Sequence, residues 1–147
     1  MARAEVSTTI NRPIEEVFAV LSDLSNNPKW ASGSVETPKK TSDGPIGVGT
    51  TWHTVDKFLG RRIESDAEYT EFEANRKIAA TSKSGPFPVE FAMTLEPVPG
   101  GTRVSQVIEA EPGGFFKLAE PLLVTIAKRQ FQNDLDNLKD LMEAHAL

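Results

Sequence analysis

The chain has 147 residues, an apolar content of 39% and a formal net charge of -5. This length suits one domain, so residues 1–147 are expected to fold as a single unit. The absence of cysteine excludes disulfides, thiolate nucleophiles and cysteine-bound metal sites. The acidic balance argues against nucleic-acid binding, which usually requires a basic surface.

No apolar stretch typical of a signal peptide follows the first residues, and no apolar run approaches membrane-spanning length. The sequence therefore predicts a cytoplasmic protein without stable membrane insertion.

The N-terminal third predicts one strand followed by two short helices. Residues 2–10 alternate and become β-branched, as in a strand. Asn11 is expected to cap a helix with Pro13 in its first turn. Residues 23–31 predict a second short helix or a tight turn, because Pro28 prevents a long helix. The apolar face of the first helix comprises Ile14, Val17, Phe18 and Leu21.

Six further strand signals follow, separated by turn residues that include Gly60 and the segment 99–101. The run 62–72 alternates most clearly, which is typical of an antiparallel strand with one wet face. The predicted strands are 35–40, 50–58, 62–72, 77–84, 89–95 and 102–111.

From about residue 116 no strand pattern remains, and a helix with Pro121 near its start is expected to run to about Ala144. Leu122 and Ile126 point away from its main apolar stripe. That stripe comprises Val124, Ala127, Phe131, Leu135, Leu138 and Met142.

This order of elements predicts an α+β fold with the helix-grip arrangement. A curved antiparallel sheet of about seven strands would wrap around the long C-terminal helix, with two short helices after the first strand. A sheet of that size must curl, and a single helix across it can leave a hollow.

Five local motifs in the same order resemble the START-like superfamily, the polyketide cyclase/dehydrase and lipid-transport group, and especially its small bacterial single-domain members. The motifs are residues 10–18, 28–30, 47–50, 100–104 and 131–141. The resemblance implies an internal cavity for a lipid, polyketide, isoprenoid or aromatic compound. It implies no shared catalytic set, so the catalytic residues stay unknown.

Aromatic and polar side chains with inward positions are the candidates for lining this cavity, since ligand sites are mostly apolar with a few polar groups. Ordinary core packing is the alternative for any single aromatic residue. The loop aromatics Phe87, Phe115 and Phe116 are further candidates. The predicted ligand-binding residues are Trp30, Trp52, Thr54, Asp56, Ser65, Tyr69, Phe91, Met93, Gln106, Leu123, Ala127, Gln130, Phe131 and Asp134.

No metal or cofactor is expected. The chain has two histidines, His53 and His145, and a catalytic zinc normally takes three protein ligands. By strand parity His53 points opposite to Asp56, so these two residues do not share a face. No phosphate-binding loop motif is present.

Three functions remain open. The first is binding of a hydrophobic or amphipathic small molecule. The second is an enzyme of the cyclase, aromatase or dehydratase type that uses Asp56, Tyr69 or Asp134 as acid or base. The third is a protein-interaction module or homodimer through the outer face of the last helix, at Leu122 and Ile126. Whether the protein is an enzyme is left undecided.

Overall fold

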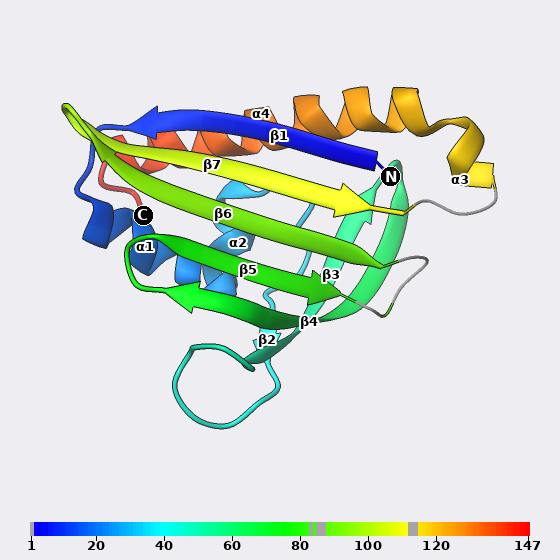
Figure 1. Cartoon of the computed structure of the whole chain (residues 1–147), viewed down its shortest axis with the longest axis horizontal. Helices are drawn as coiled ribbons and strands as arrows, with labels where there is room; N and C mark the ends of the chain where they lie inside the picture. The colour runs from blue at the N-terminus through cyan, green and yellow to red at the C-terminus, as the bar shows by residue number, and fades with distance from the viewer. Residues whose placement is uncertain (1, 83, 85–87, 112–114) are drawn as a thin grey trace.

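The computed structural model describes residues 2–82, 84, 88–111 and 115–147, with the side chains of residues 115 and 116 left out (Figure 1). Strand β1 (Ala2–Ile10) leads into helix α1 (Ile14–Ser22). The 3₁₀ turn η1 (Leu24–Asn26) and the short helix α2 (Asn27–Trp30) follow.

The remaining strands form antiparallel neighbours in a seven-stranded sheet with the order β1-β7-β6-β5-β4-β3-β2. The predicted α+β helix-grip fold is thereby confirmed. The other elements are β2 (Lys39–Lys40), β3 (Thr51–Phe58), β4 (Arg61–Glu73), β5 (Lys77–Ser82), β6 (Val89–Val98), β7 (Gly101–Ala110), α3 (Phe115–Leu118) and α4 (Glu120–Glu143).

The two ends of the strands differ in what covers them. At the closed end, Ile10 pairs with Thr102, and α1 lies beside the C-terminal part of α4 (Figure 1). At the open end, Ala2 pairs with Ala110, and Val89 pairs with the same Ala110 from the other side. The N-terminal part of α4 lies at this open end (Figure 1).

The register of the strands places alternate residues on an inner face, toward α4, and an outer face. Trp52 is opposite Ala67, and Met93 is opposite Gln106. All of these residues lie on the inner face, as the alternation of the sequence predicts. Tyr69 keeps this parity, and the register shifts by one residue after it through a bulge.

The β3–β4 hairpin extends the inner face beyond its neighbour β5. Its turn uses Leu59 and Gly60, with φ values of 52° and 76°, which is the left-handed geometry that tight hairpins favour. Ala67 pairs with Ser82, the last residue of β5, so the part of β4 before Ala67 continues past that strand.

The apolar core fills the closed half of the fold. Ile10, Val104, Leu135 and Leu138 are fully buried there. The rest of this cluster includes Val6, Val17, Phe18, Leu21, Trp30, Trp52, Tyr69, Ile78, Leu95 and Met142.

The expected Asn11 cap of the first helix is wrong. Helix α1 begins at Ile14, and its N-cap is Pro13, which offers no side-chain hydrogen bond. Asn11 lies too early in the chain to reach the free amides of the first turn. Its own backbone amide instead donates to the Glu143 carboxylate at 2.8 Å, so the residue ties the β1–α1 junction to the end of α4.

We predict that two leucines of α4 differ sharply in their contribution to stability. Leu138 is fully buried and Leu122 is 62% exposed. Leu138→Ala should lower the free energy of unfolding by about 2–5 kcal/mol, because it removes buried apolar contacts and leaves a cavity. Leu122→Ala should change it by less than about 0.5 kcal/mol. Chemical denaturation followed by fluorescence measures both, and equal losses would contradict this phasing of α4.

Candidate functional site

The structure brings thirteen of the fourteen predicted ligand-binding residues to the inner face of the sheet or to α4. On the strands these are Trp52, Thr54, Asp56, Ser65, Tyr69, Phe91, Met93 and Gln106. On α4 they are Leu123, Ala127, Gln130, Phe131 and Asp134. The fourteenth, Trp30, ends the short helix α2 and is buried in the core.

On β6 and β7, the inner-face side chains become less buried from the closed end to the open end. On β1 and β5 they do not, since Ala4 and Ser82 near the open end are buried. On β6, Leu95 is buried, whereas Met93, Phe91 and Val89 are only half-buried. A well-packed core buries apolar side chains almost completely. The inner face of β6 is therefore packed at one end and incompletely covered at the other.

The facing walls show the same gradient. On β7, Val104 is fully buried, while Ile108 is half-buried. On α4, Leu135 is fully buried, while Phe131 and Ala127, one and two turns earlier, are half-buried. The sheet and the helix thus leave the same region incompletely filled, next to the open end.

Trp52 and Tyr69 belong to the packed region rather than to this open half. Both are almost fully buried, and their rings lie 6.4 Å apart. The Tyr69 hydroxyl donates to the backbone oxygen of Ser22 at 2.8 Å. Burial, helped by the charge of Asp23, raises the pKa of Tyr69 far above its ordinary value. Tyr69 therefore fastens α1 to the sheet and is poorly placed to exchange protons.

Asp134 is committed to joining α4 to the loop after α2. Its carboxylate accepts from the backbone amide of Ser32 at 3.0 Å and from the Ser32 hydroxyl at 2.8 Å. Burial raises the pKa of Asp134, and the two bonds from Ser32 oppose that rise. A Cβ on the neighbouring Gly33 would lie 2.8 Å from Nε2 of Gln130, at the far end of a flexible side chain, and 3.3 Å from the Lys57 backbone oxygen, so the loop passes close to both α4 and β3.

Asp56 carries a carboxyl group on the inner face that has few hydrogen-bond donors around it. Burial raises the pKa of Asp56, and a hydrogen bond from Thr54 offsets part of that rise. The Thr54 hydroxyl has one hydrogen and lies 3.4 Å from the Ser65 oxygen, which is long for such a bond. In this geometry the Thr54 hydroxyl is the donor and the Ser65 backbone oxygen is the acceptor. The raised pKa means that the ionised form of Asp56 is less favoured here than on a surface aspartate, because burial removes water from the charge.

Gln106 adds an unsatisfied acceptor to the inner face. Its side-chain oxygen is buried and has no hydrogen-bond partner among the residues that the structure describes. In the packed half, the indole N–H groups of Trp30 and Trp52 are also buried without a partner in the described part of the chain. An unpaired buried polar group costs about 1–3 kcal/mol, so such groups are unusual in a core built for stability alone.

His53 lies on the outer face, opposite in parity to Asp56 as predicted. Its Nδ1 is 3.0 Å from Asp66, and its Nε2 is 3.3 Å from Glu64. Hydrogen bonds to Asp66 and Glu64 raise the pKa of His53. Within the described ranges, no group of three or more His, Cys, Asp and Glu side chains is arranged to hold a metal ion.

The sequence prediction omitted several inner-face residues, and three of its aromatics cannot be placed. Ile63 and Ile108 also lie half-buried on the inner face. Aligning each predicted strand with its neighbour in the sequence would have added these two residues to the predicted ligand-binding set. Phe87 lies outside the described residues, as do the side chains of Phe115 and Phe116.

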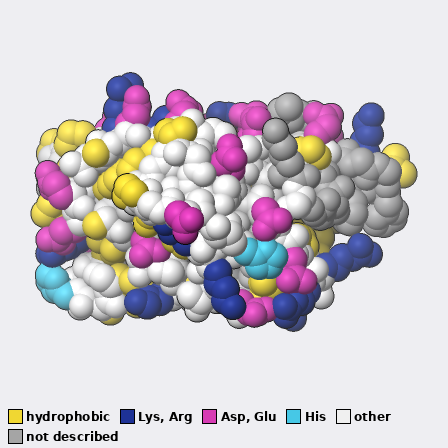
Figure 2. Space-filling model, turned by 90° about the horizontal axis from the view of Figure 1, so that it is seen from below, with side chains coloured by type: hydrophobic (Ala, Val, Ile, Leu, Met, Phe, Trp, Pro, Cys, Tyr) yellow, Lys and Arg dark blue, Asp and Glu magenta, His cyan; other side chains and the backbone are white. Residues whose placement is uncertain are grey.

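Two surface grooves lie away from the inner face. One, of about 490 Å³, runs between β1 and α4 beside Arg3, Arg103 and Lys128. The other, of about 410 Å³, lies on the outer face over Ala79 and Ala92. Figure 2 shows acidic and basic side chains interspersed on the face that it presents, without a broad basic patch among the described residues.

We predict that Asp56→Asn stabilises the protein at neutral pH. The pKa of Asp56 is raised in the folded chain above its ordinary 3.8. Its favourable contribution to folding is therefore complete below about pH 3.8 and is lost as the pH rises through the folded pKa. The variant should melt at a higher temperature than the parent at pH 7, and this difference should shrink toward pH 3.

Asp43→Asn, in the exposed loop between β2 and β3, is the matched control and should show no such pH-dependent gain. Thermal melts at both pH values measure the effect. A gain for Asp56→Asn that is equal at pH 3 and pH 7 would mean that ionisation of this carboxyl does not cause it.

Solved structures of three bacterial proteins share this fold over nearly the whole chain. A protein from Thermus thermophilus is 19% identical with a TM-score of 0.83, and the match covers 99% of both chains. A START superfamily protein from Mycobacterium smegmatis is 15% identical with a TM-score of 0.72, covering 99% of this chain and 97% of that chain. The Zhui aromatase/cyclase from a Streptomyces species is 14% identical with a TM-score of 0.77, covering 99% and 95%.

At these identities the likeness establishes the fold alone. No curated protein gives a significant sequence match. The family described as polyketide cyclase / dehydrase and lipid transport has a sequence profile that matches residues 1–143. Because this match spans almost the entire chain, the protein belongs to the polyketide cyclase/dehydrase and lipid transport family.

Proposed function

We propose that this protein binds a hydrophobic or amphipathic small molecule between the open half of the inner face and the N-terminal half of α4. Residues 1–147 would then act as one START-like ligand-binding domain. The observation that carries the proposal is the fall in burial along β6, β7 and α4 toward the same end. Apolar side chains left half-covered on three facing elements gain free energy when an apolar ligand covers them.

The chemistry of these walls suits such a ligand. Phe91, Met93 and Ile108 supply apolar surface from the sheet. Gln106 and Gln130 add amide groups on opposite walls. Ligand sites generally combine a mostly apolar lining with a small number of polar groups that fix orientation.

Membership of the family supports the same proposal. Its description names polyketide cyclases, dehydrases and lipid transport, all of which act on largely apolar molecules. A lipid, polyketide, isoprenoid or aromatic compound is accordingly the proposed ligand class. None of the described helices is long and apolar enough to cross a membrane. A cytoplasmic location stays a prediction.

Asp56 favours a second candidate function, a cyclase, aromatase or dehydratase reaction in the same place. Of the three predicted acid–base residues, Tyr69 and Asp134 are engaged by Ser22 and Ser32. Asp56 keeps acceptor capacity and a raised pKa on the inner face. A placed carboxyl group typically contributes ~10²–10⁴-fold to an acid–base reaction. Loss of turnover of a polyketide-like substrate in Asp56→Asn would test this function.

The third hypothesis, an interaction face on the outer side of α4, has less support. Leu122 is 62% exposed, but Ile126 is half-buried, so these two residues do not form one continuous exposed patch. A homodimer through this face stays a prediction, which the oligomeric state in solution would test.

Binding of apolar probes is the direct test of the proposed function. Environment-sensitive fluorophores with a naphthalene ring should bind the native protein with Kd values in the micromolar range, about -8 kcal/mol. Ala127→Trp should weaken this binding at least tenfold, because a large ring on this half-buried position of α4 would fill the ligand space.

Leu122→Trp is the matched control, since it adds the same ring to an exposed position of the same helix. It should leave probe affinity unchanged. Circular dichroism should show that both variants are folded. If a folded Ala127→Trp binds the probes as well as the parent does, the ligand does not lie between α4 and the sheet.

A further inference from the structure

The inner face carries acidic groups at two described positions. Asp56 lies on β3 and Asp134 on α4. Whether a positive charge offsets these two carboxylates depends on where the Lys and Arg side chains lie.

Most cations of the strands occupy outer-face positions. Residues that pair across neighbouring strands lie on the same face of the sheet. Arg3 pairs with Glu109 and Lys57 pairs with Arg62, and all four lie on the outer face. Several of these cations pair with outer carboxylates, for example Lys77 with Glu71 at 2.9 Å. The described strand cations with outer parity are Arg3, Lys39, Lys57, Arg62, Lys77 and Arg103.

Two strand cations have inner parity, and neither lies deep in the open half. Arg61 stands at the tip of the β3–β4 hairpin, where it is exposed and already engaged in an interaction. Lys40 lies beside Trp52 at the far edge of the sheet. Its ammonium group donates to the backbone oxygens of Ser42, at 3.0 Å, and Gly44.

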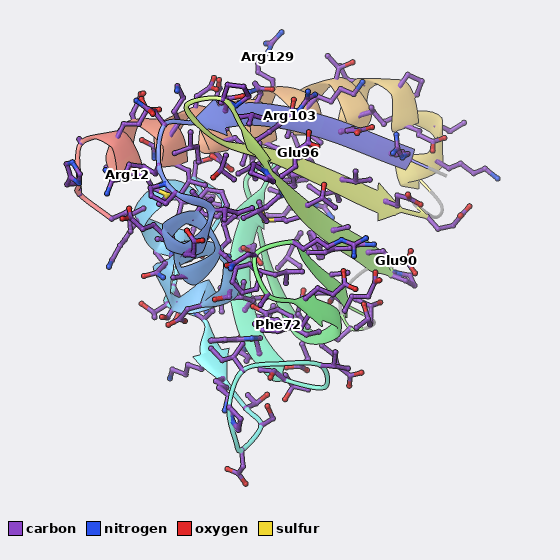
Figure 3. All side chains as sticks on the ribbon, turned by 60° about the vertical axis from the view of Figure 1, so that its left-hand side comes forward. Arg12, Phe72, Glu90, Glu96, Arg103 and Arg129 are labelled. Carbon is purple, nitrogen blue, oxygen red and sulfur yellow. The ribbon has the colours of Figure 1, made fainter. Side chains whose placement is uncertain are left out.

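The cations of α4 also point elsewhere. Figure 3 shows Arg129 projecting from α4 away from the sheet. Lys139 donates to the Thr9 backbone oxygen at 2.7 Å and to Glu143 at 2.6 Å. Lys128 is exposed beside the groove at β1. Lys117 of α3, at the open end, is exposed as well. Among the described residues, the inner face of the open half thus holds the Asp56 carboxyl group and no buried cation.

Asp56 differs from Asp134 in its unused capacity to accept hydrogen bonds. Asp134 already accepts two bonds from Ser32. In the described part of the chain, Thr54 is the one hydrogen-bonding neighbour of the Asp56 carboxyl group, and its hydroxyl also lies 3.4 Å from the Ser65 backbone oxygen. An ionised carboxylate offers about four lone-pair sites to donors. Of the two inner-face carboxyl groups, Asp56 therefore has more to gain from a hydrogen-bond donor on a ligand.

We infer that Asp56 selects the charge class of the ligand: it accepts a hydrogen bond from a neutral hydroxyl or phenol group and excludes ligands with a carboxylate. This inference rests on the proposed binding function and specifies its ligand. A hydroxyl donor on a carboxylate forms a charge-assisted bond, which is stronger than a neutral one. A ligand carboxylate in the same place would meet a like charge away from water, without a cation to offset it.

Three probes with one naphthalene skeleton separate these effects. At pH 7, 2-naphthol offers a hydroxyl donor, 2-methoxynaphthalene offers none, and 2-naphthoate carries a negative charge. Isothermal titration should rank their affinities in that order. The naphthol should bind at least about tenfold more tightly than the methoxy compound, as expected for one hydrogen bond to a charged group. The naphthoate should bind at least tenfold more weakly than the methoxy compound.

Two aspartate variants of the same hairpin identify the residue responsible. Asp56→Asn should reduce the affinity ratio of naphthol to naphthoate at least tenfold, because it removes the negative charge from the inner face. Asp66→Asn removes a charge one position beyond Ser65, from the outer face, where Asp66 contacts His53. That variant should leave the ratio unchanged.

The outcomes distinguish this inference from the function on which it rests. If none of the three probes binds the native protein, the proposed binding function fails and the inference fails with it. If the probes bind but naphthoate binds as tightly as naphthol, binding stands and the charge selection is overturned. A ratio that is unchanged in Asp56→Asn would likewise overturn the role of Asp56.

Discussion

Helix α4 packs tightly against the sheet over only part of its length, and the other features of this protein follow from that. Its 24 residues span about 36 Å, comparable to the ten residues of β6 at about 33 Å. Leu135 and Leu138 are fully buried, yet Phe131 and Ala127 on the same stripe are half-buried. A straight helix cannot follow a twisted sheet along its full length. Close packing at the closed end therefore leaves the open end incompletely filled.

Polar groups on the inner face are tolerable where packing is incomplete. Asp56, Thr54 and Gln106 are all half-buried rather than enclosed. In the closed half, two buried hydroxyls have partners: Tyr69 donates to Ser22, and the Thr102 hydroxyl donates to the Arg12 backbone oxygen at 2.9 Å. The buried indole N–H groups of Trp30 and Trp52 have no partner among the described residues. In the open half, the buried side-chain oxygen of Gln106 lies where a ligand could supply the hydrogen-bond donor that it lacks among the described residues.

Features with a short period were predictable from the sequence, and features that depend on distant contacts were not. Alternation in residues 62–72 placed Ser65 and Tyr69 on one face, because a strand has a period of two. The helical period likewise located the stripe of α4. The hydrogen bonds from Ser32 to Asp134 and from Asn11 to Glu143 join residues more than 100 positions apart, and no local sequence pattern predicts them. For the same reason the sequence could identify Asp56, Tyr69 and Asp134 as candidate acid–base residues. It could not show that Tyr69 and Asp134 already form hydrogen bonds within the protein.

Stability and ligand selection can vary independently in this arrangement. The residues that hold the fold together, such as Ile10, Val104 and Leu138, lie at the closed end and make no use of the polar inner positions. Asp56 lies beyond them, on the part of the β3–β4 hairpin that extends past the end of β5. Because burial raises its pKa, ionised Asp56 destabilises the folded state. A substitution at this position changes the charge offered to a ligand without removing a core contact. Residues that cost stability yet occupy a binding wall are the expected sites of a trade-off between stability and function. By that reasoning, relatives that keep the closed-end core and differ at the position of Asp56 should bind ligands of a different charge class.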